Sequence, residues 1–407
     1  MKTLQNFING KFVASKSGKT SELINPATGK VFATAPVSNL DDVNLAMKSA
    51  ADAFVIWRDS TPSERQRALL KIADALEAKA DQLIAIEVEN CGKPIGLTKS
   101  EEIPPMLDQI RFFAGAARNL EGRSAGEYMK GMTSFIRREP LGVCAQVTPW
   151  NYPMMMAVWK WAPAIAAGNT VVLKPSDTTP ASTLFMAEIM SEFLPAGVIN
   201  VVCGDRDTGR LLVEHKTPAL VSITGSVRAG IEVAKSAAND LKKVHLELGG
   251  KAPVVVFDDA NLQAAAEAIA LAGFFNAGQD CTAATRVMVE AGAYEDFVKL
   301  LAEQASEKIA VGLPNEEVIV GPVNNANQLS RLKGFFERKP AHARVVAGGK
   351  QIERPGFFFA PTVVADLKQD DEMIQSEIFG PVITVQKFQD EAQAIEMANG
   401  VEYGLAS

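Results

Sequence analysis

Apolar segments and helical segments alternate through the middle of the chain, and this alternation constrains the fold more than any other feature. The pattern predicts strands at 142–147, 170–173, 198–202, 219–223 and 243–248, and helices near 154–167, 180–194, 206–215 and 228–240. Continuous apolar strands that alternate with helices form a parallel sheet covered on both faces. The sequence therefore predicts an α/β fold with a doubly wound sheet.

Small, polar and charged residues follow these strands, at the end where an open parallel sheet binds its ligands. They are Thr148-Pro149-Trp150-Asn151, Lys174-Pro175-Ser176-Asp177, Gly204, Thr224-Gly225-Ser226 and Gly249-Gly250. All of these groups can contact a nucleotide. Lys174 is suited to ribose hydroxyls, although a solvated lysine at a strand end is the ordinary interpretation, and the Pro-Ser-Asp turn after it favours the nucleotide.

The usual G-x-G-x-x-G fingerprint does not follow the first of these strands. A glycine pair follows the fourth strand instead, at Gly225 and Gly230. Such spacing is weak evidence by itself, but here it lies between a strand and a helix. Backbone N–H groups and the helix dipole at that position would hold a pyrophosphate.

A second pattern places a cysteine after a small-residue turn. An apolar helical run at 261–275 ends in Asn276-Ala277-Gly278-Gln279-Asp280-Cys281, where the glycine allows a sharp turn and leaves room beside the sulfur. A thiol presented in this way is a candidate nucleophile. A buried structural cysteine is the commoner role for an isolated Cys, so the rest of the sequence must decide.

The remaining segments complete a chain of several parts. An Asn-Gly hairpin at 7–13 and a strand at 31–34 predict a small N-terminal sheet, and the segment 126–140 predicts an exposed two-stranded ribbon. Such a ribbon is marginally stable alone, so packing on another subunit and an ordinary surface hairpin are both open. Further expected elements are helices at 41–57, 62–90, 104–120, 294–309 and 325–338, and strands at 252–257, 285–289 and 358–364.

Composition excludes several classes of function. Of the 407 residues, 47% are hydrophobic and 22% charged, and the net charge of −7 argues against a nucleic-acid surface. The four cysteines are too widely spaced for a disulfide framework, and the three histidines show no metal-ligand spacing. No signal peptide is evident, and the apolar stretch 154–167 is too short to cross a membrane. We expect a cytoplasmic protein without a metal site.

Taken together, the motifs resemble the aldehyde dehydrogenase superfamily, from Phe7 to Ser407. They occur in the family's order as Thr148-Pro149-Trp150-Asn151-Tyr152-Pro153, Lys174-Pro175-Ser176, Thr224-Gly225-Ser226, Glu247-Leu248-Gly249-Gly250-Lys251, Gly278-Gln279-Asp280-Cys281 and Glu377-Ile378-Phe379-Gly380-Pro381-Val382. The residue sequences of the segments 90–94, 111–118 and 276–284 are similar to those of γ-aminobutyraldehyde (1-pyrroline) dehydrogenases and the related betaine-aldehyde dehydrogenases.

The resemblance implies a role for each matching residue. Cys281 would attack the aldehyde, Asn151 with the Cys281 backbone N–H would stabilise the oxyanion, and Glu247 would be the base for the hydrolytic water. A partly buried Glu247 would have its pKa raised towards a useful base. The implied cofactor is NAD, with NADP as the alternative because Asp177 stands where the family commonly has Glu. Its implied contacts are Thr148, Pro149, Trp150, Lys174, Ser176, Asp177, Gly204, Thr224, Gly225, Ser226, Leu248, Glu377 and Phe379.

The resemblance also implies an organisation and a partner. Residues 1–125 and 141–248 would form a Rossmann-type NAD-binding domain, 126–140 an oligomerisation ribbon of a homodimer or homotetramer, and 249–407 an α/β catalytic domain. Family members usually continue tens of residues beyond Ser407, with the last strands of that domain and an intersubunit tail. We therefore expect this catalytic domain to lack its C-terminal end.

The expected substrate is an ω-aminoaldehyde such as 4-aminobutanal. Its ammonium group needs carboxylates or aromatic faces, and Tyr152, Trp159 and Asp280 are the candidates. Asp280 as a turn cap and Trp159 as a core residue are the alternatives. Two other functions stay open: an acylating semialdehyde dehydrogenase, in which a thiol takes the acyl group, and a shortened inactive or scaffold homologue. Retention of Glu247 favours hydrolysis.

Overall fold

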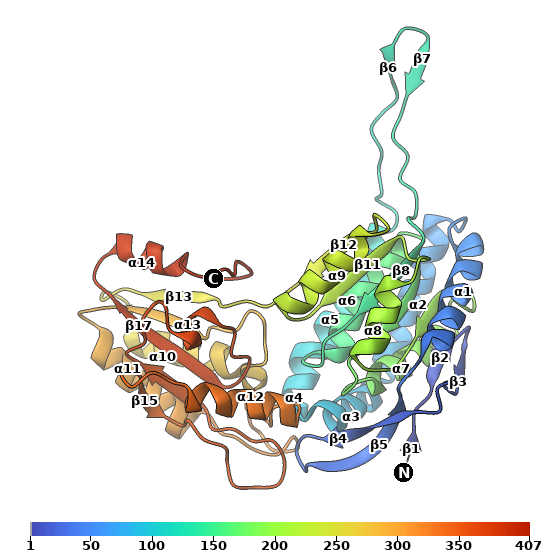
Figure 1. The fold of residues 1–407 in the computed structure, drawn as a ribbon. Helices are drawn as coiled ribbons and strands as arrows, with labels where there is room; N and C mark the ends of the chain where they lie inside the picture. Colours follow the sequence, from blue (N-terminus) through green and yellow to red (C-terminus); the bar gives the residue numbers. More distant parts are fainter. Residues whose placement is uncertain (1) are drawn as a thin grey trace. The chain divides into compact units, whose positions relative to one another are not determined.

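The computed structural model describes residues 2–407 and divides the chain into two compact units (Figure 1). Unit 1 comprises Met1–Leu23, Phe32–Glu87 and Lys99–Glu247, and unit 2 comprises Ile24–Val31, Val88–Thr98 and Leu248–Ser407. Two short N-terminal segments thus belong with the C-terminal part of the chain, and the 126–140 ribbon belongs to unit 1.

The elements up to residue 116 are mainly helical. They are β1 (Lys2–Thr3), β2 (Asn6–Ile8), β3 (Lys11–Val13), β4 (Thr20–Asn25), β5 (Lys30–Pro36), α1 (Leu40–Trp57), α2 (Pro62–Ala78), α3 (Ala80–Cys91), α4 (Ile95–Leu97), η1 (Thr98–Glu102) and α5 (Ile103–Ala116). Capping boxes start α1 at Asn39 and α2 at Thr61. The helix expected over 62–90 is broken at Lys79, and the one expected to reach residue 120 ends at Ala116.

The rest of unit 1 alternates strands and helices, as the pattern predicts. The elements are β6 (Gly126–Met129), β7 (Met132–Ser134), β8 (Val143–Val147), α6 (Pro153–Ala166), β9 (Thr170–Lys174), α7 (Ala181–Met190), β10 (Ile199–Val201), α8 (Arg206–Glu214), β11 (Leu220–Thr224), α9 (Val227–Ala238) and β12 (Lys243–Glu247). The main sheet has the order β12-β11-β8-β9-β10-β2-β3, and its first five strands are parallel. The doubly wound α/β prediction is confirmed.

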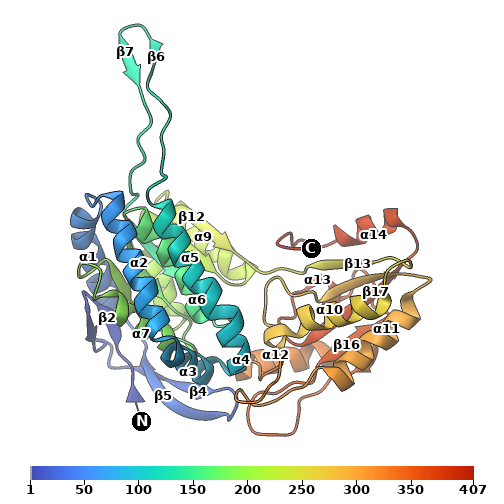
Figure 2. The same ribbon diagram turned by 180° about the vertical axis from the view of Figure 1, so that it is seen from behind.

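Helices cover both faces of this sheet, which explains its apolar strands. Helices α1, α8 and α9 pack on one face, seen in Figure 1, and share a buried apolar cluster with β8, β9 and β11. Helices α2, α5, α6 and α7 lie on the other face, seen in Figure 2. Strands β8, β9 and β10 are covered on both faces and are almost entirely buried, whereas the edge strand β12 is largely exposed and alternates polar with apolar residues.

The N-terminal hairpin differs from expectation in its location. Asn9 and Gly10 take positive φ values of 55° and 75°, as a tight hairpin turn requires. However, β2 pairs antiparallel with β10 through Phe7 and Val201, so this hairpin extends the main sheet. The separate small sheet contains only β1, β5 and β4.

Unit 2 is built on a five-stranded sheet of order β13-β14-β17-β16-β15. Its elements are β13 (Pro253–Val256), α10 (Leu262–Phe274), η2 (Phe275–Gly278), β14 (Arg286–Glu290), α11 (Tyr294–Glu303), η3 (Gln304–Lys308), α12 (Ala326–Glu337), β15 (Arg344–Ala347), β16 (Thr362–Ala365), α13 (Glu372–Gln375), β17 (Val382–Phe388) and α14 (Glu391–Ala398). Buried side chains of α10, α11 and α12 share one apolar cluster with β14, β16 and β17. Ala394 of α14 joins Met288 and Phe388 in a separate cluster.

Candidate functional site

The strand order of unit 1 creates a position at the edge of the sheet where a ligand can bind. From β8 the chain proceeds to β9 and β10 on one side, and then to β11 and β12 on the other. The order therefore reverses between β8 and β11, the switch point at which doubly wound sheets bind nucleotides. The register aligns Val147 with both Lys174 and Ile223, and Thr224 with Glu247. The predicted residues after these strands consequently share one edge of the sheet.

Several features of this edge fit a dinucleotide. Ser226 caps α9 by accepting a hydrogen bond from the N–H of Ala229 at 3.3 Å, so the N-terminus of α9 faces the edge beside Gly225. The hydroxyl of Thr148 is buried and has no hydrogen-bond partner in the described part of the chain. A buried hydroxyl without a partner costs free energy unless a ligand completes it. The switch point thus offers an anion-binding helix end and an unsatisfied donor.

Lys174 is placed differently from a simple ribose contact. Its buried amine donates to the carbonyls of Pro175 and Gly204, both at 2.8 Å, and burial lowers its pKa. An ammonium group has three donors, so one remains for a ligand. Gly204, with φ of 154°, allows the approach of Thr208, whose hydroxyl would lie 2.1 Å from an added Cβ. The hydroxyl of Ser176 donates to Asp177, which is exposed.

The remaining predicted residues of unit 1 lie on the loop after β8 and on α6. Asn151 and Tyr152 are buried and precede the first turn of α6, while Pro149 and Trp150 are half-buried. Trp159 is 46% exposed on the surface of α6. The core interpretation of Trp159 is therefore wrong.

Glu247 lies at the end of a series of hydrogen-bonded polar side chains that the sequence did not predict. Its carboxylate is 3.1 Å from Nε2 of His245, and Nδ1 of His245 is 2.9 Å from the hydroxyl of Ser222. The amine of Lys160 donates to that hydroxyl at 2.8 Å. Two signals in the sequence pointed here. Lys160 is a charged residue in an apolar helix, and His245 shares the strand face of Glu247 at a spacing of two.

In unit 2, a left-handed turn presents Cys281. Asn276, Ala277 and Gly278 all have positive φ, of 48°, 57° and 66°. This conformation is costly for the two non-glycine residues and ends α10 abruptly. Gly278 has no alternative here, because an added Cβ would lie 2.0 Å from the carbonyl oxygen of Gly380. The side chain of Gln279 anchors the turn by donating to the Asn276 carbonyl and accepting from the N–H of Asn324.

Cys281 differs from the other cysteines in its exposure. Cys91, Cys144 and Cys203 are buried, and burial raises the pKa of Cys144 and Cys203 to about 12. Cys281 is only half-buried. A thiol that a substrate can reach is required of a nucleophile, and among the four cysteines this describes Cys281.

Asp280 has a local structural role. Its Oδ1 accepts hydrogen bonds from the backbone N–H of Thr282 at 2.9 Å and from its hydroxyl at 2.8 Å. Asp280 therefore caps the turn, as the alternative interpretation predicts. Carboxylate oxygens can each accept more than one hydrogen bond, so a second role towards a cation stays a prediction.

The segment after Glu247 packs beside the cysteine in unit 2. The N–H of Gly250 donates to Oε1 of Glu377 at 3.0 Å, and an added Cβ at Gly250 would lie 2.2 Å from the carbonyl oxygen of Cys281. Burial raises the pKa of Glu377, and Lys251, also buried, has a pKa lowered to about 7. Leu248, Cys281 and Glu377 thus belong to one unit. Phe379 follows Glu377 with a positive φ of 60°.

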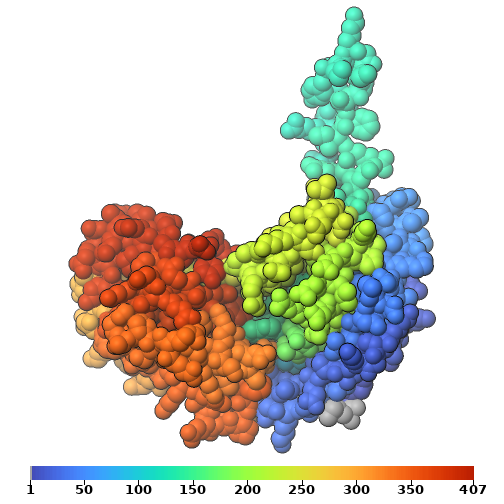
Figure 3. Space-filling model, viewed as in Figure 1, coloured from blue at the N-terminus to red at the C-terminus, as the bar shows by residue number. Residues whose placement is uncertain are grey.

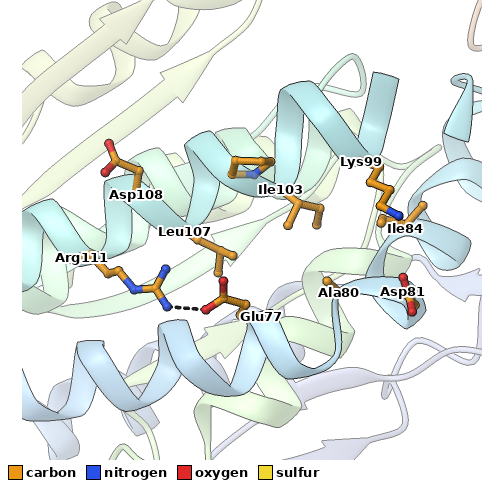
Figure 4. Close-up of a pocket in the computed structure, with 10 residues that line it drawn as sticks. Glu77, Ala80, Asp81, Ile84, Lys99, Ile103, Leu107, Asp108 and Arg111 are labelled. Carbon is orange, nitrogen blue, oxygen red and sulfur yellow. Dashed lines mark hydrogen bonds and ion pairs between the residues drawn. The ribbon is translucent and has the colours of Figure 1, made fainter. Parts of the chain in front are cut away.

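A surface pocket elsewhere in unit 1 contains none of the predicted site residues. It has a volume of about 370 Å³ and is lined by α2, α3, η1 and α5 (Figure 4). Arg111 crosses it to Glu77 at 2.5 Å. This pocket therefore adds no residue to the candidate site.

Two absences apply to residues 2–407. No helix there has the length and apolar character that a membrane span requires. No group of three or more His, Cys, Asp or Glu side chains in this range is arranged to hold a metal ion.

These features define a class: an α/β protein with a doubly wound sheet suited to a dinucleotide and a cysteine presented on a left-handed turn. Residues 12–407 match the model of the aldehyde dehydrogenase family, and the chain belongs to that family.

Solved structures agree with this assignment. The chain is 36% identical to PnpE from Pseudomonas sp. WBC-3, with a TM-score of 0.95, covering 100% of this chain and 84% of that one. It is 35% identical to an aldehyde dehydrogenase from Bacillus cereus in complex with NAD+, with a TM-score of 0.96 and coverage of 100% and 84%. A betaine aldehyde dehydrogenase from Staphylococcus aureus in complex with NAD+ is 33% identical, with a TM-score of 0.96 and coverage of 98% and 81%.

The buried amine of Lys160 gives a prediction for stability. Burial lowers its pKa from 10.5 to about 8, and Glu247 partly opposes this effect. Between these values the unfolded chain binds more protons than the native one, so Lys160 makes stability rise with pH from about 8 towards 10.5. Lys160→Met should remove this rise in urea-unfolding free energies. Lys71→Met, at an exposed position on α2, should keep the wild-type slope. An unchanged slope in Lys160→Met would contradict the burial effect.

Proposed function

We propose that the chain oxidises an aldehyde to its carboxylate through covalent intermediates on Cys281, with NAD as cofactor and NADP as the alternative. The single observation that carries the proposal is the presentation of Cys281, half-buried on a left-handed turn, in a member of the aldehyde dehydrogenase family. The Cys281 thiolate attacks the carbonyl carbon and gives a thiohemiacetal. When bound, NAD would supply the hydride acceptor for oxidation of this adduct to a thioester.

Asn151 and Glu247 are proposed to act on the same substrate. The Asn151 amide and the Cys281 backbone N–H stabilise the negative oxygen, and Glu247 takes a proton from the water that hydrolyses the thioester. Asn151 is buried on the loop before α6, which suits a fixed donor. Glu247 is about half-exposed and can be reached by water. A carboxylate in this role favours hydrolysis over transfer to a thiol.

The unit 1 edge is proposed to hold the cofactor. Thr148, Pro149, Trp150, Gly225 and Ser226 surround the switch point, where α9 offers its N-terminus to the pyrophosphate. Support comes from the buried hydroxyl of Thr148, which lacks a partner in the described chain, and from the remaining donor of Lys174. Ser176, Asp177, Gly204 and Thr224 complete this group, and Leu248, Glu377 and Phe379 are assigned to the nicotinamide end.

The cysteine, amide and carboxylate make separable contributions that kinetics can resolve. Cys281→Ala should abolish NADH formation. Asn151→Ala should slow the first turnover by about 10²–10³, the usual effect of losing one oxyanion donor. Glu247→Gln should keep the first burst of NADH and slow later turnovers on the order of 10²-fold. Stopped-flow NADH fluorescence with a panel of aldehydes measures all three.

The matched control is Cys91→Ala, which removes a buried thiol and should turn over like the wild type. NADH formation by Cys281→Ala, or none by the wild type with any aldehyde, would refute the proposal. Turnover only with an added thiol acceptor would identify the acylating reaction instead.

For the substrate, we propose an ω-aminoaldehyde recognised in part by Asp280. The carboxylate precedes the nucleophile by one residue and is half-buried, where a charge is screened less than at the surface. Tyr152 and Trp159 are the proposed aromatic contacts. We also propose that the protein is cytoplasmic and that it forms a homodimer or homotetramer.

Asp280→Asn tests the substrate while keeping the turn, because the amide oxygen can still accept from Thr282. KM for 4-aminobutanal should rise by a factor that corresponds to a loss of binding free energy on the order of 1 kcal/mol. KM for butanal should stay unchanged. Equal effects on both aldehydes would show that Asp280 only caps the turn.

The ribbon supports the proposed oligomer. It extends from unit 1 as a thin two-stranded projection (Figure 3), and Tyr128, Met129, Met132 and Phe135 on it are 60% to 76% exposed. Two paired strands without a core are marginally stable, and exposed apolar groups of this size mark an interface. A second copy of the chain is the proposed partner.

Replacing Tyr128 and Phe135 together by Asp should convert an oligomer into a monomer, because charges cannot be buried unpaired at an interface. Light scattering after size-exclusion chromatography gives the mass. Ile56→Asp, at a position 68% exposed on α1, should leave the mass unchanged. A wild-type monomer, or equal masses for wild type and the double variant, would argue against the interface.

A further inference from the structure

The surface pocket lined by α2, α3, η1 and α5, called the α5 pocket below, has an apolar middle and charged ends. One wall is a single stripe of η1 and α5 in which every fourth residue faces the pocket, namely Lys99, Ile103, Leu107 and Arg111. The facing wall comes from the end of α2 and the start of α3, and consists of Glu77, Ala80, Asp81 and Ile84. Figure 4 shows Asp108 and Arg111 at one end of the pocket, and Asp81 and Lys99 at the other.

The Arg111 end has an excess of negative charge. The guanidinium of Arg111 is 2.5 Å from Glu77 and 3.0 Å from Asp74, and these hydrogen bonds raise the pKa of Arg111. Asp108 lies one helical turn before Arg111 and is exposed. Three carboxylates thus surround one guanidinium, which leaves two negative charges in excess. A cation from solution would be attracted to this end.

The other end offers a second carboxylate. Asp81 and Lys99 are both exposed, and within residues 2–407 neither they nor Asp108 makes a hydrogen bond or ion pair. Hydrocarbon separates the two ends, because Ile103 and Leu107 lie between them (Figure 4). Along α5 the rise from Ile103 to Arg111 is about 12 Å. A ligand that fills the pocket therefore needs a positive group at each end and an apolar chain between them.

We propose that the α5 pocket binds a linear aliphatic diamine or polyamine. One ammonium group lies beside Asp108 and Glu77, the methylene chain lies along Leu107 and Ile103, and the second ammonium group lies beside Asp81. The exposed side chain of Lys99 turns to solvent when the site fills. The volume of about 370 Å³ is at the small end of the range for ligand pockets, which suits a thin, linear molecule.

Other ligand classes fit the α5 pocket less well. An anion would meet the excess negative charge at the Arg111 end. A single metal ion would need converging ligands, and no group of three or more His, Cys, Asp or Glu side chains in residues 2–407 is arranged to hold one. A zwitterion with a carboxylate at one end could pair with Lys99, but it would then face Asp81 with the wrong charge.

Calorimetric titration of the full chain with 1,8-diaminooctane, at low ionic strength and without aldehyde, measures this binding directly. Affinity should rise along a series of linear diamines, by up to about fourfold for each methylene group that leaves water. Octylamine lacks the second charge and should bind about two- to fivefold more weakly. The zwitterion 8-aminooctanoate should also bind more weakly than the diamine. Added NaCl should weaken the binding of the diamine, since exposed charges are screened.

Three exposed positions identify the site without disturbing the core. Asp81→Asn and Asp108→Asn should each weaken the binding of 1,8-diaminooctane by about two- to fivefold. Lys99→Met should strengthen it by a similar factor, because it removes a charge of the same sign as the ligand. The matched control is Glu214→Gln, at an exposed carboxylate of α8 on the opposite face of the sheet, and it should bind as wild type does.

Asp280→Asn separates this site from the proposed substrate site, where an ammonium group could also bind, and it should leave the affinity unchanged. Equal affinities in wild type, Asp81→Asn, Asp108→Asn and Lys99→Met would overturn the proposal. Weakening by Asp280→Asn alone, or tighter binding of 8-aminooctanoate than of the diamine, would overturn it as well. The proposal does not depend on the reaction at Cys281, so a chain that forms no NADH with any aldehyde would leave it standing.

Discussion

The in-register hydrogen bonding of the five parallel strands in unit 1 is the constraint on which the rest of that unit depends. Because β8, β9 and β11 are aligned residue by residue, their following loops all emerge at one edge, although 76 residues separate Val147 from Ile223 in sequence. Helices α1, α8 and α9 pack on these strands through a shared apolar cluster. The anion-binding end of α9 and the buried loop of Asn151 are consequences of it.

In unit 2 the main structural feature is a fixed backbone turn that presents a reactive side chain. Three successive left-handed residues end α10, and close backbone contacts at Gly250 and Gly278 hold the turn. No side chain larger than hydrogen fits at these two glycines without displacing a carbonyl oxygen. The position of Cys281 is therefore set by backbone packing more than by its own contacts.

Local patterns predicted the elements well where one period dominates. The strands of the doubly wound sheet and helix α10 lie within a residue or two of expectation, because apolar runs and caps act locally. The break at Lys79 and the strand β17 were missed, since periodicity continues across the first and the second is buried on both faces and so lacks the alternation of a half-solvated strand. The hairpin at 7–13 was found, but its sheet was not, because strand partners are a long-range choice.

By itself the sequence determined the fold class, the candidate nucleophile and the family, since these depend on short motifs and their order. Only the tertiary structure decided that Lys160, Ser222 and His245 line up behind Glu247, or that Gly250 lies against Cys281 and Glu377. The physical reason is that side-chain neighbours across a sheet or beneath a helix come from residues tens of positions apart. Their pairing is fixed by register and packing, which no local pattern records.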